Sequence, residues 1–411
     1  MISAPVTSAD PGQPASYSWE ATDEGVADRF GLPVEQVVRF DLNTSPAPPS
    51  LLGEMLAAGR FETSLSEYPP GDYRHLVEAA ADRYGVGTDE VVPGAGADEI
   101  LDMAVKAFLR AGQRAVVPVP TYAMYRVVTE QRGGTVVPVP RLGPDQGFAL
   151  DVPAVREAAR TAAMVWVCNP NNPTGAEEPE GAVESLLAGI EADAAAEGRR
   201  PAAVIVDEAY AEFTGRSSIG LRSRYANLIV VRTASKAYAL AGLRVGFAVA
   251  TPPTLERVAV YRPPGSIGTI SETVVTRALR EPAAMRANVA RVEAERPRLA
   301  AAFEAAGWRP YPSVACFVLV DLGSTARASF VAEQLLRRGL VPRTFPVGHP
   351  AERCLRVTVR APHENDRLIE AIAQVAADAA RIDTDTPVSI PLDPTPPAPD
   401  AAPAAAPEDP A

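Results

Sequence analysis

Residues 228–244 read LIVVRTASKAYALAGLR, an apolar run followed by a turn that carries one lysine, Lys236. The run from Leu228 to Val231 is short, rich in β-branched residues and apolar at every position, which is typical of a buried parallel strand. Lys236 then stands just beyond the carboxyl end of that strand, where open α/β sheets bind their ligands. The stretch therefore predicts an α/β sheet with an amine at its ligand-binding edge.

Further apolar runs of similar length precede this stretch, and helical patterns lie between them. They span residues 115–119, 135–139, 164–168 and 203–206. Parallel strands joined by helices have a helix layer on both faces, so their side chains are apolar on both faces too. The sequence therefore predicts a large α/β domain over residues 45–265, with a mostly parallel, doubly wound sheet.

A second, smaller domain is predicted after Tyr261, where the alternation changes. A long helical stretch over about 270–306 comes first, and strands at 316–320, 340–343 and 355–359 then frame helices at 329–338 and 364–381. We expect a C-terminal α+β domain over residues 266–382 and a separate N-terminal segment over residues 1–44. Residues 383–411 are rich in Pro and Ala and too poor in large apolar side chains to offset their ordering entropy, so a disordered tail is predicted.

Composition argues against several classes of function. The formal net charge of −12 disfavours nucleic acid and anionic membranes as partners, because both are bound through concentrated Lys and Arg. The three cysteines are far apart and lack the spacing of zinc sites or disulfide frameworks. The sequence shows neither a run of about 18 apolar residues nor a secretory leader. We therefore expect a soluble, cytoplasmic protein with no metal site, no membrane span and no nucleic-acid partner.

Lysine is nearly absent from the chain. All but two of the 39 cationic side chains are arginine, and the two lysines are Lys106 and Lys236. Lys106 falls in line with Asp102 and Arg110 at helical spacing, which is typical of a solvated ion pair. Lys236 taken alone would also fit a solvated loop position. Its retention favours chemistry that needs an amine, since arginine cannot form an imine.

A second strand end carries an acid and a phenol. Asp207 follows the apolar run 203–206, and Tyr210 comes shortly after it. A carboxylate can keep a pyridine nitrogen protonated, because an opposite charge a few ångströms away shifts a pKa by ~1–3 units. A phenol can hydrogen-bond an oxygen on such a ring. The alternative is a strand-end aspartate that caps the next turn.

Two loops complete the candidate binding elements. Residues 91–99 read VVPGAGADE and lead into a predicted helix, whose free amides carry roughly +0.5 charge and suit a phosphate. A dinucleotide-binding loop is not expected, because Gly-x-Gly-x-x-Gly would need glycine where Glu99 stands. Residues 168–175 read CNPNNPTG and can direct Asn172 at a ring oxygen, although a plain turn has the same composition.

Together these segments resemble those of fold-type-I enzymes that use pyridoxal 5'-phosphate (PLP), and specifically the histidinol-phosphate aminotransferase branch. The matching segments are 94–99 (GAGADE), 120–125 (PTYAMY), 171–175 (NNPTG), 207–210 (DEAY), 233–244 (TASKAYALAGLR) and 355–359 (LRVTV). The resemblance covers about residues 37–380. It implies a homodimeric aminotransferase that moves an amino group between an amino acid, or an amino phosphate, and a 2-oxo acid through a Schiff base on Lys236.

The resemblance also implies a role for each matching residue. Lys236, Asp207 and Tyr210 would be catalytic, with Asp207 at the pyridine nitrogen and with Tyr210 and Asn172 at the phenolic oxygen. Tyr122 would stack on the ring. The other cofactor-binding residues, most of them around the phosphate, would be Ala97, Asp98, Glu99, Thr233, Ser235, Arg244 and, from the neighbouring subunit, Tyr68. The substrate-binding residues would be Arg356, Asn43 and Arg343.

Some positions depart from the family pattern. Residues 43–46 read Asn-Thr-Ser-Pro, whereas the family usually has Asn-Glu-Asn-Pro, so Thr44 and Ser45 differ. Cys316 stands where asparagine is common, and Arg360 stands where glycine is usual. We therefore do not expect histidinol phosphate itself to be the natural substrate. The arginines that suit a phosphorylated or dicarboxylic substrate are Arg262, Arg343 and Arg356.

Other functions stay open on the sequence. The same cofactor site supports decarboxylation, β-elimination or oxidative deamination in an enzyme of secondary metabolism. A ligand-sensing regulator of this fold would need a DNA-binding domain, for which the segment before residue 45 is too short and too acidic. A nicotinamide oxidoreductase would not depend on Lys236.

Overall fold

The computed structural model of the chain describes residues 21–59, 61 and 63–382, and the predicted tail over 383–411 lies outside them. Its centre is a seven-stranded sheet whose strands are, in sheet order, β2 (Val91–Gly94), β8 (Gly246–Val249), β7 (Leu228–Thr233), β6 (Ala203–Asp207), β5 (Met164–Cys168), β3 (Arg114–Val119) and β4 (Thr135–Pro140). Neighbouring strands are parallel except where β8 pairs antiparallel with β2 and β7. The predicted mostly parallel α/β sheet is confirmed.

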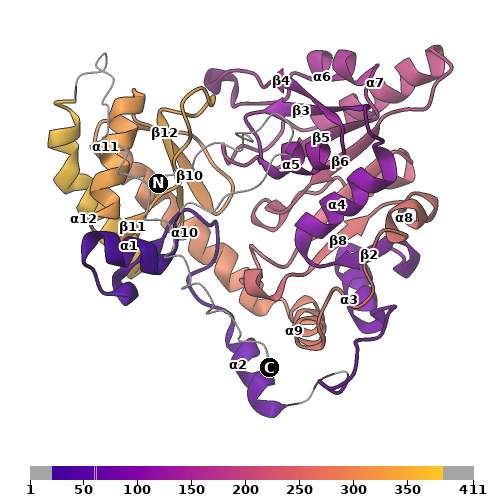
Figure 1. The fold of residues 1–411 in the computed structure, drawn as a ribbon, viewed down its shortest axis with the longest axis horizontal. Coiled ribbons are helices and arrows are strands. Elements are labelled where there is room, and N and C mark those ends of the chain that lie inside the picture. The colour runs from indigo at the N-terminus through magenta and orange to yellow at the C-terminus, as the bar shows by residue number, and fades with distance from the viewer. Residues whose placement is uncertain (1–20, 60, 62, 383–411) are drawn as a thin grey trace, which may run out of the picture.

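Helices cover both faces of this sheet (Figure 1). They are α3 (Arg74–Tyr84), α4 (Gly96–Phe108), α5 (Met124–Gln131), α6 (Val152–Ala159), α7 (Ala182–Ala196), α8 (Pro252–Ala259) and α9 (Thr269–Arg280), and α2 (Ser50–Ala58) packs beside α9. Alternate residues of β6 enter two separate cores: Val204 and Val206 pack in the core that includes α3, α6, α7 and α9, whereas Ala203 and Ile205 pack with α4, α5 and α8. This double burial explains why the strands have no polar face.

The small domain contains a three-stranded antiparallel sheet in the order β12 (Cys354–Thr358), β10 (Phe317–Asp321) and β9 (Arg309–Pro310). Its helices are α10 (Ala283–Ala305), α11 (Thr325–Leu336) and α12 (Pro362–Ala379). The N-terminal segment joins this domain: α1 (Asp23–Phe30) packs against α11, and β1 (Val38–Arg39) pairs parallel with β11 (Leu340–Val341). The described part of the predicted N-terminal segment, residues 21–44, thus contacts the small domain through α1 and β1.

The differences from the predicted elements have local physical reasons. β2 and β8 were not predicted, because each has only four residues and each contains glycine. β7 runs to Thr233, one residue past its predicted end at about Arg232, and the charge of Arg232 is tolerated inside the sheet because Glu208 and Glu212 pair with it. The helical stretch over 270–306 is two helices, since Pro282 lies between α9 and α10. Within the described ranges, no helix is both long enough and apolar enough to span a bilayer.

Candidate active site

The predicted cofactor residues converge because they follow the ends of adjacent strands. Four of them lie beyond the carboxyl ends of parallel strands: Tyr122 after β3, Asn172 after β5, Asp207 at the end of β6 and Lys236 after β7. The chain from β2 enters α4 directly at the same edge, and there it places Asp98 in the first turn. This edge is where open α/β sheets bind ligands.

The Lys236 amine lies at the centre of this edge. Its Nζ donates to the carbonyl oxygen of Leu42 at 3.3 Å and lies 6.0 Å from the centre of the Tyr210 ring. Burial lowers the pKa of Lys236, and the positive charge of Arg356 lowers it further. Such an amine is neutral more often than a surface lysine and is therefore a better nucleophile.

Lys106 has the ordinary role that its spacing predicted. Its Nζ pairs with Asp102 at 2.6 Å, one helical turn away on α4, and 39% of its side chain is exposed. The two lysines of the chain thus differ in burial and in partner, and only Lys236 lies at the ligand-binding edge.

Asp207 is a buried carboxyl, only 3% exposed. The Tyr125 hydroxyl donates to its Oδ2 at 2.8 Å, and the Ala209 amide donates to its Oδ1 at 3.0 Å. Burial raises the pKa of Asp207 from 3.8 to about 6, although both hydrogen bonds lower it. A carboxyl with this pKa can hold or release a proton near neutral pH, and a cationic ring nitrogen would stabilise its charged form.

Tyr125 was not assigned a role from the sequence. Its ring stacks on Trp166 at 5.1 Å, and this packing directs its hydroxyl at Asp207. The available signal was a second tyrosine three residues after Tyr122 in PTYAMY.

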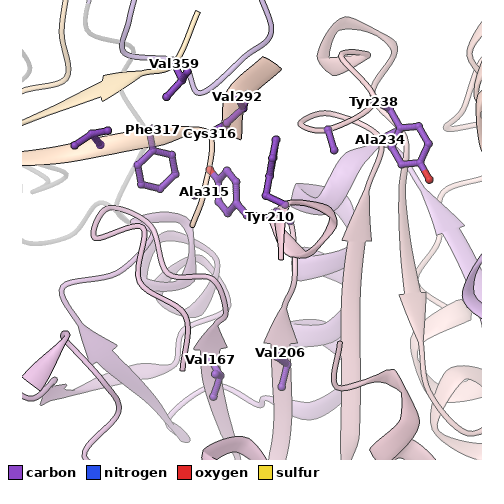
Figure 2. Close-up of a cluster of buried hydrophobic side chains, with 14 of the residues drawn as sticks. Val167, Val206, Tyr210, Ala234, Tyr238, Val292, Ala315, Cys316, Phe317 and Val359 are labelled. Atoms are coloured by element: carbon purple, nitrogen blue, oxygen red, sulfur yellow. The ribbon is translucent and has the colours of Figure 1, made fainter. Parts of the chain in front are cut away.

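Tyr210 lies where the large domain meets the small one. Figure 2 shows it beside Cys316 and Phe317, beyond the ends of the strands that carry Val167 and Val206. Its ring packs edge-to-face on Phe317 at 5.2 Å, and its hydroxyl accepts a hydrogen bond from Asn43 Nδ2 at 3.0 Å. Burial raises the pKa of Tyr210 well above its usual value, so the phenol stays protonated and remains a donor.

The start of α4 forms a corner whose free backbone amides suit an anion. The amides of its first turn, including those of Ala97, Asp98 and Glu99, have no partner within the helix. Gly246 allows β8 to press on this turn, since a Cβ there would lie 2.6 Å from the Ala97 nitrogen. Gly96 has a positive φ, and a side chain there would collide with Arg244.

The side chains around this corner are linked to one another. Arg244 donates to Asp98 Oδ2 at 3.0 Å, and the Tyr122 hydroxyl donates to Asp98 Oδ1 at 3.2 Å. The Glu99 carboxylate accepts from the Ala95 amide at 2.6 Å and from Ser266 Oγ at 2.8 Å, so it stabilises the loop before α4. Only the backbone amide of Glu99 is then available to an anion at the helix start. Ser235 and Thr233 are buried nearby, with their hydroxyl oxygens 2.9 Å apart.

Arg356 connects the small domain to this edge. It lies on β12 and is 8% exposed, and its Nη1 donates to Asn172 Oδ1 at 2.6 Å. Its Nη2 donates to the carbonyl oxygen of Asp41. The backbone of Arg343 pairs with that of Arg356 through two hydrogen bonds of 3.0 and 2.9 Å, so the two predicted substrate residues are neighbours.

Two of the departures from the family pattern lie at this site. Cys316 is buried, with its Sγ 3.7 Å from the carbonyl oxygen of Asn43. Burial raises the pKa of the Cys316 thiol, and the nearby charges of Lys236 and Arg356 oppose that shift. Ser45 donates to Asn288 Oδ1 on α10 at 3.1 Å. Both residues therefore lie close to Lys236 or to elements that contact it.

Tyr68 does not join the other residues. Its side chain is 91% exposed, and its ring lies near Gly265, outside the cluster around Lys236. Arg262 is also at the surface, where it stacks over Tyr73 at 5.3 Å.

The groups gathered at this edge fit the functional groups of PLP. They offer an amine for its aldehyde, a buried carboxyl for its pyridine nitrogen, a phenol and an amide for its phenolic oxygen, and a helix start with an arginine for its phosphate.

Comparisons with known proteins agree with this chemistry. The family model "Aminotransferase class I and II" matches residues 46–374. The histidinol-phosphate aminotransferase of Roseiflexus castenholzii is 36% identical over 363 residues, which are 86% of this chain and 93% of that protein. That of Thermococcus gammatolerans is 36% identical over 340 residues, 82% of this chain and 92% of that protein.

A solved structure is also similar. The histidinol-phosphate aminotransferase from Sinorhizobium meliloti, in complex with PLP, superposes with a TM-score of 0.79 at 25% identity and covers 88% of this chain and 96% of that one. The chain therefore belongs to the class I and II aminotransferase family and is a PLP-dependent aminotransferase.

Proposed function

We propose that Lys236 is the residue that bonds the cofactor, in an enzyme that moves an amino group between an anionic amine and a 2-oxo acid. The observation that supports this most strongly is the position of its amine, which lies partly buried at the shared end of β5, β6 and β7 and has a lowered pKa. When bound, PLP supplies the electron sink that makes the substrate's α-proton removable.

The residues of the chain then divide the remaining work. Lys236 would be the general base for the α-proton, because its lowered pKa leaves its amine partly neutral. Asp207 would supply a negative charge for the ring nitrogen, and Tyr125 stabilises that charge by its hydrogen bond. Tyr210, whose raised pKa keeps its phenol protonated, would donate to the ring oxygen.

Lys236 is tested by reductive trapping. The holoenzyme is treated with borohydride, digested and mapped, and we expect the label on the peptide that contains Lys236. Lys236→Ala should lose the label, whereas Lys106→Ala is the matched control and should keep it. A label on Lys106, or none, contradicts the proposal.

We propose that the substrate carries an anionic group, a carboxylate or a phosphate, that binds Arg356. Arg356 is buried, its guanidinium donates to Asn172, and the backbone of Arg343 pairs with its own, so two arginines are neighbours at this end of the site. Guanidinium groups bind carboxylate and phosphate through paired hydrogen bonds. The relatives named above act on histidinol phosphate, an amino phosphate.

The substrate proposal is tested with a panel of amines and 2-oxoglutarate. The panel includes histidinol phosphate, histidinol, α-amino acids and their decarboxylated amines. Each compound that carries a carboxylate or phosphate is expected to have a higher kcat/KM than its counterpart that lacks this group. Equal turnover of histidinol and histidinol phosphate, together with equal turnover of each amino acid and its decarboxylated amine, would refute it.

We also propose that the active unit is a homodimer in the cytoplasm. Tyr68 is a large side chain left 91% exposed, which fits a residue that enters the site of a second copy. The three cysteines are free and buried, as suits a reducing compartment.

Subunit complementation tests the exchange of Tyr68. Tyr68→Ala and Lys236→Ala homodimers should both be nearly inactive. A mixed dimer has one site with Lys236 from one chain and Tyr68 from the other, so unfolding and refolding the two variants together should restore activity. Failure to restore it while mixed dimers form counts against the exchange.

A further inference from the structure

Helix α10 contacts the backbone that carries Lys236. Asn288, on its second turn, donates from Nδ2 to the carbonyl oxygen of Ala237 at 2.9 Å, and the same nitrogen lies 3.5 Å from the carbonyl oxygen of Lys236. Ala239 in the same turn has a positive φ of 59°, a strained conformation that a non-glycine residue keeps only when its surroundings hold it. The Asn288 amide is thus a side-chain anchor of the lysine turn.

The other end of the Asn288 amide is held in turn. Arg291 donates from Nη2 to Asn288 Oδ1 at 2.7 Å, and Ser45 Oγ donates to the same oxygen at 3.1 Å. Arg291 Nη1 donates to the carbonyl oxygen of Arg360, just after β12, and lies 3.5 Å from that of Val359. Every polar group of the Asn288 side chain is therefore engaged, and its orientation is fixed.

These contacts form a continuous link from the lysine turn to the strand that carries Arg356. Arg356 and the carbonyl groups that hold Arg291 belong to the same short stretch, residues 356–360. A shift of β12 therefore reaches Asn288 through a charged hydrogen bond, which is stronger than a neutral one.

We propose that Asn288 is a positioning residue for Lys236 and that Arg291 couples this position to the substrate-binding strand. The inference rests on the proposed role of Lys236. The lysine side chain has four rotatable bonds, so its amine is placed only as well as its backbone is fixed, and small displacements of a reacting group cost large factors in rate. Asn288 and Arg291 contact the backbone on either side of the site and do not need to touch substrate.

The test compares four variants of the holoenzyme. Asn288→Ala removes the anchor, and Asn288→Asp keeps the acceptor for Arg291 and Ser45 but removes the donor to Ala237. Arg291→Ala removes the coupling, and Arg286→Ala is the matched control, since Arg286 is an exposed arginine of the same helix. Each variant is measured for kcat, KM, thermal unfolding and the pH midpoint of the absorbance of the Lys236-bound cofactor.

We expect both Asn288 variants to lower kcat about tenfold, the factor that one lost hydrogen bond supplies, with KM changed less. The pH midpoint of the cofactor absorbance should move, because the environment of the Lys236 nitrogen changes. Arg291→Ala should lower kcat in the same direction, and Asn288→Ala with Arg291→Ala should lose less than the product of the two single losses. Arg286→Ala should match the wild type.

Variants that lose only thermal stability, with kcat and the pH midpoint unchanged, overturn the inference. Multiplicative losses in the double variant overturn the coupling. Borohydride mapping of the wild type separates this from the proposed function: a label away from Lys236 refutes both, whereas a label on Lys236 with unaffected variants refutes the inference alone.

Discussion

Asp207→Asn should make the apoprotein more stable at neutral pH while it disables the enzyme. The side chain fits in place, because Oδ1 can still accept from the Ala209 amide and Nδ2 can donate to the Tyr125 hydroxyl, which both donates and accepts. The variant therefore removes a charge without leaving a buried group unpaired.

The magnitude follows from the pKa of Asp207. Burial raises that pKa from 3.8 to about 6, so the folded apoprotein binds the proton more tightly than the unfolded chain. The stabilisation by this group is complete below pH 3.8 and is lost as the pH rises through about 6. At ~1.4 kcal/mol per unit of pKa, the loss is about 3 kcal/mol. Asparagine has no such dependence.

The assay is urea unfolding of both apoproteins between pH 4 and 8. The difference in free energy of unfolding, variant minus wild type, should rise by roughly 2.4 kcal/mol over this range, because the unfolded chain is already partly ionised at pH 4, and the other titrating groups cancel in the difference. The kcat of the reconstituted variant should fall by about 10²–10³, as when a preorganised charge is removed from a reacting centre. A difference that is flat with pH, or that falls, would refute the account of Asp207.

Three further substitutions test the neighbouring groups. Tyr125→Phe removes the hydrogen bond that lowers the pKa of Asp207, so that pKa should rise, as measured by the unfolding titration described above. Its kcat, measured by steady-state kinetics, should fall about tenfold at pH 7. Arg356→Ala should raise KM for the anionic substrate by roughly 100-fold, the loss of a charged hydrogen-bonding group, with cofactor affinity by titration nearly unchanged. Lys106→Ala should change the free energy of unfolding by less than about 1 kcal/mol and leave kcat/KM unchanged, because its pair with Asp102 is exposed.

The sequence sufficed wherever a functional residue follows its own strand. Lys236 and Asp207 were predictable because the apolar runs before them define the strand ends, and the sheet then brings those ends together. The helix start at Ala97 was predictable for the same reason, since glycines precede it. The sheet is mostly parallel, as predicted, and the strands missing from the prediction are β2 and the antiparallel β8.

Contacts between distant segments were not predictable. Tyr125 meets Asp207 across 82 residues of sequence, and Asn288 meets Ala237 across 51. An asparagine inside a helix such as α10 gives no local signal of a distant partner, because the hydrogen bonds of its backbone are made within the helix and do not depend on what its side chain contacts. Single-residue patterns record which face is buried, whereas the Tyr125–Asp207 pair depends on how α5 packs on the sheet and the Asn288–Ala237 pair on how the two domains pack.

Arg360 shows how such packing changes the meaning of a departure from a family pattern. Its guanidinium donates to the carbonyl oxygen of Arg39 at 3.1 Å and pairs with Glu364 at 2.8 Å, and it is only 9% exposed. The segment that it holds continues to Leu42 and Asn43, which contact Lys236 and Tyr210. A glycine at position 360 would offer neither bond. Arg360 therefore holds this N-terminal wall of the site against the small domain through two contacts that a glycine could not make.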